Sequence, residues 1–101
     1  MKLFLDDTRN VPEGYILVRT YKEMIKLLES TKPEDIEEIS LDHDLGSKES
    51  GYDICKWIVA NNYWPKTISL HSANIVGVGN MIQLLNHYKP STTILNRKIF
   101  Y

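Results

Sequence analysis

The chain alternates between short apolar runs and longer segments in which apolar positions recur at helical spacing. The short runs fall at residues 3–5, 15–19, 39–41, 67–70 and 93–95 and are rich in aliphatic and β-branched residues. Runs of this kind, bounded by turn residues, are typical of strands. The pattern therefore predicts five strands, of which 93–95 has the weakest signal.

Three segments between these runs have the features of helices. The first is predicted to begin after Thr20, because Thr20 and Glu23 have the spacing of a capping box. The second is predicted to begin after Ser50, which can cap a helix. The third covers residues 81–88, with Asn74 as an alternative, earlier start.

Strands that alternate with helices predict a single α/β domain over residues 1–101 with a mostly parallel sheet. No repeat or linker divides the chain, and the segment 8–14 is too short for a helix between the first two strands. In such sheets, ligands bind beyond the carboxyl ends of the strands. Side chains at those ends are the first candidates for a functional site.

The predicted sheet has two unlike faces. With a period of two, one face receives Ile39, Leu41, Ile68 and Leu70, and the other receives Ser40, Thr67 and Ser69. We therefore expect three helices on the apolar face and no complete helical layer on the other. Phe4 and residues 99–101 are expected to cover the second face, by a folded-back tail in a monomer or, as the less favoured alternative, by a dimer contact.

Composition narrows the possible functions. The 12 basic and 13 acidic residues leave a net charge of -1, which argues against binding in a DNA groove. The apolar runs are too short to span a membrane, and the acidic residues at 6–7 argue against a signal peptide. The single cysteine, Cys55, excludes an internal disulfide and a multi-cysteine zinc site. We therefore expect a cytoplasmic protein.

Carboxylates, histidines and other polar residues gather where the predicted strands end. These positions hold Asp6 and Asp7, then Asp42, His43 and Asp44, then His71, Ser72 and Asn74, and finally Asn96 and Arg97. Carboxylates brought together repel one another and share a cation or a proton. Carboxylate oxygens suit Mg²⁺, arginine suits phosphate oxygens, and histidine can transfer a proton near neutral pH. The set favours phosphoryl chemistry.

Each residue has a simpler interpretation when it is considered alone. Asp6 and Asp7 could form a turn, and His71 could be bonded to backbone at the end of a strand. The shared placement at strand ends favours a site. His87, late in a helix, and Cys55, on an apolar stripe, are interpreted as structural.

The strand-end residues resemble those of receiver domains of two-component response regulators. Receivers carry an acidic pair after the first strand, a phosphate-accepting aspartate after the third, a hydroxyl residue after the fourth and a lysine after the fifth. The corresponding positions here hold Asp6 and Asp7, Asp42, His71 followed by Ser72, and Arg97 followed by Lys98. The chain departs from that pattern at His71 and Arg97, and it lacks segments for the first and last receiver helices.

A closer similarity is to the branch called cyclic-phosphate processing receiver domains. The similar motifs are Leu5-Asp6-Asp7-Thr8-Arg9, Ser40-Leu41-Asp42-His43-Asp44-Leu45-Gly46, Gly51-Tyr52-Asp53, and His71-Ser72-Ala73-Asn74 followed by Gly77 and Met81. The resemblance implies a flavodoxin-like sheet of order 2-1-3-4-5 with about three helices. It also implies binding or processing of a cyclic phosphate derived from a nucleotide, ADP-ribose or an RNA end.

On this basis we expect a metal-dependent phosphoesterase. Asp6, Asp7 and Asp42 would hold Mg²⁺ (or Mn²⁺), with Asp44 as a fourth ligand or as the partner of a histidine. His43 and His71 would act as acid and base, with Asp42 attacking phosphorus in a covalent variant. Phosphate contacts would come from Arg9, Ser72, Asn74 and Arg97. The alternative is a non-enzymatic regulatory module that is phosphorylated on Asp42 or senses a phosphate ligand.

Overall fold

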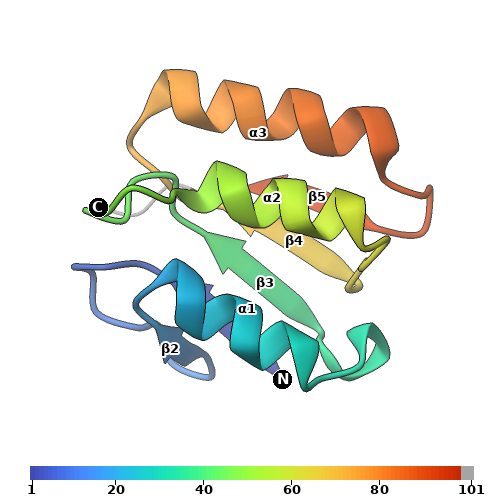
Figure 1. Ribbon diagram of the computed structural model, residues 1–101, viewed down its shortest axis with the longest axis horizontal. Helices are drawn as coiled ribbons and strands as arrows, with labels where there is room; N and C mark the ends of the chain where they lie inside the picture. Colours follow the sequence, from blue (N-terminus) through green and yellow to red (C-terminus); the bar gives the residue numbers. More distant parts are fainter. Residues whose placement is uncertain (99–101) are drawn as a thin grey trace.

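A computed structural model describes residues 1–98 of the chain. Its five strands form one parallel sheet in the order β2-β1-β3-β4-β5 (Figure 1). Along the chain the elements are β1 (Lys2–Leu5), β2 (Ile16–Val18), α1 (Tyr21–Glu29), a 3-10 helix η1 (Pro33–Asp35), β3 (Glu38–Leu41), α2 (Gly51–Ala60), β4 (Thr67–Leu70), α3 (Ile75–Tyr88) and β5 (Ile94–Arg97). The receiver-like α/β fold with three α-helices is confirmed.

Side-chain caps fix the starts of the three α-helices. The Thr20 hydroxyl accepts a hydrogen bond from the Glu23 amide at the start of α1, and Ser50 forms a full capping box with Asp53 at the start of α2. The Asn74 side chain accepts from the Gly77 amide, so α3 begins at the earlier of the two predicted positions.

The last strand differs from its prediction. β5 covers Ile94–Arg97 instead of 93–95, because the ladder continues until the Lys98 amide bonds to the Leu70 carbonyl at 2.8 Å. Asn96 and Arg97 therefore lie inside the strand, and Lys98 is the first residue after it.

All three α-helices cover one face of the sheet (Figure 1), as expected. Helix residues such as Met24, Ile58 and Met81 pack against the alternate strand positions in one continuous apolar core. The strand residues of that core are Leu3, Leu5, Val18, Ile39, Leu41, Ile68 and Leu70. At about 25 cal/mol per Å² of apolar surface, this core is the main source of folding free energy.

The other face of the sheet, which we call the open face, carries polar and aromatic side chains that are nonetheless buried. Phe4, Ser40, Ser69 and His71 are each at most 1 % exposed. Tyr15, from the loop between β1 and β2, packs edge-on against Phe4 with ring centroids 6.0 Å apart. The expected cover by residues 99–101 lies outside the described residues. Within residues 1–98, no helix combines the length and apolarity that a membrane span needs.

Candidate active site at the carboxyl ends of the strands

Three candidate residues lie side by side because each is the first residue after its strand. The amides of Asp6, Asp42 and His71 bond to the carbonyls of Val18, Leu5 and Leu41 at 3.0 Å, which continues the ladder by one step. The period of two then directs the three side chains to the open face. One potential ligand atom from each of them lies within 4.8 Å of the other two.

Asp6 is a buried carboxylate held by three hydrogen bonds and an ion pair. Its Oδ1 accepts from the amides of Thr8 and Arg9 at 3.0 and 2.9 Å. Its Oδ2 lies 3.0 Å from His71 Nε2 and 3.5 Å from Arg9 Nε. Burial raises the pKa of Asp6, but the hydrogen bonds from Arg9, Thr8 and His71 outweigh that effect and hold the pKa below its usual value. Asp6 is therefore ionised.

His71 connects Asp6 to Ser40 beneath the site. Its Nδ1 lies 2.7 Å from the Ser40 hydroxyl, and its Nε2 lies 3.0 Å from Asp6 Oδ2. Because a carboxylate can only accept, Nε2 carries the proton and Nδ1 accepts from Ser40. Burial lowers the pKa of His71 despite the adjacent Asp6. The ring is thus neutral, buried and engaged at both nitrogens.

Asp42 is the carboxylate that remains half-buried and reachable. Burial is the largest cause that raises its pKa, and the negative charge of Asp6 raises it further. Hydrogen bonds from the Ser72 hydroxyl and from the His43 and Asp44 amides oppose this rise without cancelling it. The ionised Asp6–Asp42 pair is therefore unfavourable in the absence of a cation.

His43 belongs to a second polar group, which includes Asp44 and Asn74. His43 Nδ1 lies 2.8 Å from Asp44 Oδ1, and the Asn74 amide group donates to both Asp44 oxygens at 3.2 and 3.3 Å. The hydrogen bond from His43 lowers the pKa of Asp44. An ionised Asp44 places the His43 proton on Nδ1, so Nε2 is the nitrogen that can accept a proton. Unlike His71, the His43 side chain is 21 % exposed.

Two glycines allow helices to approach these residues. A Cβ on Gly77 would lie 2.4 Å from the His43 ring, and a Cβ on Gly51 would lie 1.9 Å from the Asp42 carbonyl oxygen. The Gly51 amide also donates to the His43 carbonyl at 2.8 Å. The first turns of α2 and α3 are thereby packed directly against the segment that follows β3.

The remaining candidates have different surroundings. Asp7 lies against Gly46, where an added Cβ would be 2.9 Å from Asp7 Oδ2, so the loops after β1 and β3 touch. Arg9 contacts Asp6 and belongs to the site. Arg97, inside β5, lines a groove with Ile82 and Asn86 of α3. The Arg97 position thus faces the helices, because it is in register with the core residue Leu70.

A polar cluster on the same face was not predicted from the sequence. Lys98 follows β5 in register with His71, and its Nζ donates to Glu38 at 2.6 Å and to the Tyr15 hydroxyl at 2.7 Å. Glu38 also accepts from Ser69 and Tyr15, each at 2.7 Å. The alternation that placed Ser69 on this face could have indicated the cluster, since Glu38 has the same parity as Ser40.

The donor set fits a hard divalent cation. Asp6 and Asp42 offer carboxylate oxygens within the 4.8 Å grouping, and oxygen donors are what Mg²⁺ prefers. A cation there would relieve the repulsion that raises the pKa of Asp42. His71 does not fit as a ligand, because coordination would break its bond to Asp6 or to Ser40.

The model of the cyclic-phosphate processing receiver domain matches residues 1–87. The chain belongs to this family. The matched span contains every candidate site residue except Arg97. The protein is therefore a receiver-like domain associated with cyclic-phosphate processing. No curated protein and no solved structure matches the chain significantly.

Proposed function

We propose that this protein is a metal-dependent phosphoesterase that hydrolyses a cyclic phosphate derived from a nucleotide, ADP-ribose or an RNA end. The observation that carries the proposal is the grouping of Asp6 and Asp42, whose carboxylate oxygens lie within 4.8 Å of one another. His43, the residue that follows Asp42, has its tautomer set by Asp44. The family match over residues 1–87 supports the substrate class.

The carboxylates of Asp6, Asp7 and Asp42 would hold Mg²⁺ or Mn²⁺. An ion there would neutralise charge on the phosphate oxygens and on the departing sugar oxygen. Asp6 is kept in place by the backbone amides of residues 8 and 9 and by His71. His71 is thus assigned to positioning Asp6 instead of to proton transfer.

His43 takes the proton from the attacking water on Nε2, while Asp44 stabilises the resulting charge through Nδ1. The water oxygen bonds to phosphorus as the bond breaks between phosphorus and one of the two sugar hydroxyl oxygens that it bridges. That oxygen takes a proton from solvent and becomes a hydroxyl. The product is an ordinary phosphate monoester.

Phosphate contacts come from Arg9 and Ser72, which border the two carboxylates. Asn74 acts one step further away, because its side chain holds Asp44 and caps α3. Arg97 is left out of this assignment, since it lines the groove against α3.

The test is hydrolysis of 2′,3′-cyclic nucleotides and cyclic ADP-ribose phosphates, followed by ³¹P NMR with Mg²⁺ and with Mn²⁺. We expect turnover that chelation abolishes, that Asp42→Asn removes and that His43→Gln lowers by about a hundredfold or more. His87→Gln, an exposed histidine at the end of α3, is the matched control and should keep full activity.

Two results would overturn the proposal. One is a folded protein that turns over none of these compounds with either metal. The other is stable phosphorylation of Asp42 by acetyl phosphate without turnover of a cyclic phosphate. The latter result would instead favour the receiver-like regulatory module.

A further inference from the structure

One edge of the sheet is built from aliphatic residues. β2 lies at the end of the strand order and consists of Ile16, Leu17 and Val18. Because Val18 accepts from the Asp6 amide of the continuing β1 ladder, it faces β1, and the next residue back, Leu17, directs its amide and carbonyl to the open edge. Unpaired backbone groups at such an edge are a template for another strand.

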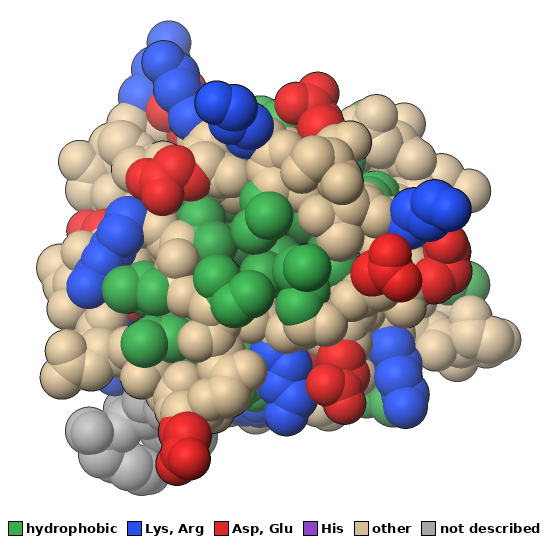
Figure 2. All heavy atoms as spheres, turned by 90° about the horizontal axis from the view of Figure 1, so that it is seen from below, with side chains coloured by type: hydrophobic (Ala, Val, Ile, Leu, Met, Phe, Trp, Pro, Cys, Tyr) green, Lys and Arg blue, Asp and Glu red, His purple; other side chains and the backbone are tan. Residues whose placement is uncertain are grey.

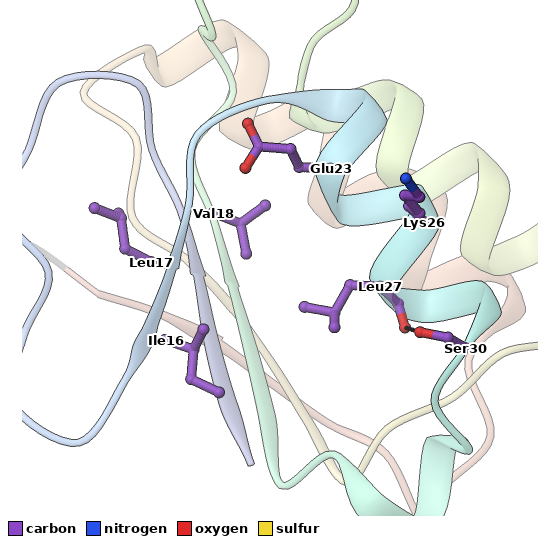
Figure 3. A pocket seen from close by; sticks show the side chains of 7 residues that line it. All are labelled: Ile16, Leu17, Val18, Glu23, Lys26, Leu27 and Ser30. Carbon is purple, nitrogen blue, oxygen red and sulfur yellow. Dashed lines mark hydrogen bonds between the residues drawn. The ribbon is translucent and has the colours of Figure 1, made fainter.

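An apolar groove runs beside this edge. It has a volume of about 320 Å³ and lies between β2 and α1. In Figure 3, Val18 and Leu27 point toward each other across it, and Glu23 and Lys26 border it from the helix. Figure 2, which views the molecule from the side of α1 and β2, shows an apolar patch at the centre of this face with side chains of both charges around it.

The opposite edge of the sheet, formed by β5, is more polar than the β2 edge. β5 ends in the polar residues Asn96 and Arg97, and charged residues at an edge discourage pairing with another chain. Ile16 on β2 and Ile94 on β5 are equally exposed, at 49 % each. Ile94 also lines a groove, between β5 and α3, but that groove includes the polar side chains Asn86, Asn96 and Arg97, whereas the three strand residues beside the β2 groove are all aliphatic.

The charges at the groove indicate what covers it. α1 contributes one acid, Glu23, and one base, Lys26, to the lining. When two copies are related by a two-fold axis beside α1, their α1 helices lie antiparallel. Glu23 of one copy then lies opposite Lys26 of the other. A surface with one residue of each sign is complementary to itself, whereas a partner of a single charge would meet a like charge at one of them.

We infer that β2 and α1 form the interface of a homodimer. In this dimer the β2 strands of two copies pair antiparallel around Leu17, while Leu27 and Ile16 close the groove between the two α1 helices. The two sheets become one continuous sheet. Because the strands of the two copies run in opposite directions, their candidate active sites lie at opposite ends of that sheet and both stay open to ligand.

Sedimentation velocity of the full chain from about 1 µM to about 1 mM tests this inference. The mass should rise with concentration from the 11.7 kDa of one chain toward that of two. Ile16→Lys should weaken association at least about tenfold, and the matched variant Ile94→Lys should leave it unchanged. Lys26→Glu should weaken it, and Glu23→Lys combined with Lys26→Glu should restore it.

The sedimentation result is independent of the proposed phosphoesterase activity, since no variant in this experiment alters a candidate site residue. Circular dichroism of each variant establishes that it is folded. A wild-type chain that stays monomeric over the whole range overturns the inference and leaves the groove to a different protein. Equal effects of Ile16→Lys and Ile94→Lys overturn it as well.

Discussion

The imidazole of His71 lies flat on the phenyl ring of Phe4, with ring centroids 4.1 Å apart and ring planes 6° from parallel. The same imidazole bridges Ser40 and Asp6. Phe4 sets the plane of the ring and Ser40 holds its Nδ1, so residues of β1 and β3 support from below the imidazole that bonds to Asp6. The arrangement contains a serine, a histidine and an aspartate in hydrogen-bonded series, but the serine is fully buried and cannot act as a nucleophile on a ligand from solvent.

A first prediction concerns the protonation of His71. Its pKa lies below the ordinary value of 6.5 because of burial, so the native ring stays neutral while the unfolded chain binds a proton. Lowering the pH through 6.5 should therefore reduce the free energy of unfolding. Nitrogen-15 NMR should show the Nε2–H tautomer of His71 unchanged from about pH 8 to below 6.5. A midpoint at or above 6.5 would contradict this neutral, buried state.

A second prediction concerns the carboxylate pair. Asp42→Asn removes the repulsion from Asp6, which contributes to the raised pKa of Asp42, and should stabilise the metal-free protein by about 0.5–1 kcal/mol. The variant should also lose the rise in melting temperature that we expect on adding Mg²⁺. Asp44→Asn, whose carboxyl group is mostly exposed and bonded to His43, should keep that rise. A destabilised Asp42→Asn variant would mean that the native carboxylate pairs with a positive group.

The third prediction compares two glycines of α3. Gly77→Ala places a methyl group 2.4 Å from His43, whereas Gly79→Ala meets nothing within 4 Å. We expect Gly77→Ala to cost about 1–3 kcal/mol and to shift the NMR signals of the His43 ring. Gly79→Ala should gain up to about 1 kcal/mol through helix propensity. Similar unfolding curves for the two variants would argue against the close packing of α3 on His43.

The fourth prediction concerns Glu38 and Lys98. Hydrogen bonds to Lys98, Ser69 and Tyr15 hold the pKa of Glu38 below its ordinary 4.5 despite burial. The ionised carboxylate therefore stabilises the fold above about pH 4.5, and this contribution is lost as the pH falls through its lower native pKa. Glu38→Gln should cost about 1–2 kcal/mol at neutral pH and should flatten the acid limb of urea unfolding measured against pH. An unchanged acid limb would place the responsible carboxylate elsewhere.

The sequence was sufficient to predict most of the architecture, because local signals and tertiary packing agree. Thr20, Ser50 and Asn74 cap the helices that their positions indicated. The alternation at Ser40 and Ser69 correctly identified the face that no helix covers within residues 1–98. These features depend on residues near in sequence or on strand periodicity, both of which a single chain displays.

The exact end of β5 and the burial of His71 could not be predicted from the sequence, because both depend on contacts between residues that are distant in the chain. Arg97 was expected to follow a strand ending at residue 95, but it lies inside β5 and Lys98 is the first residue after it. Since adjacent strand residues point in opposite directions, Arg97 faces the helices and Lys98 faces the open face. The role of His71 depends on whether its ring reaches solvent, and that is decided by Phe4 and Ser40, which lie far from it in the chain.

The placement of all three helices on one face has a consequence for how such a domain can diversify. Substitutions of Phe4, Ser40 or Ser69 would reshape the floor beneath the carboxylates without touching the apolar interior that holds the helices to the sheet. Changes that alter ligand preference are thereby separated in space from changes that threaten folding. Proteins with this arrangement can therefore change ligand preference through substitutions on one side of the sheet, while the apolar core on the other side keeps the fold stable.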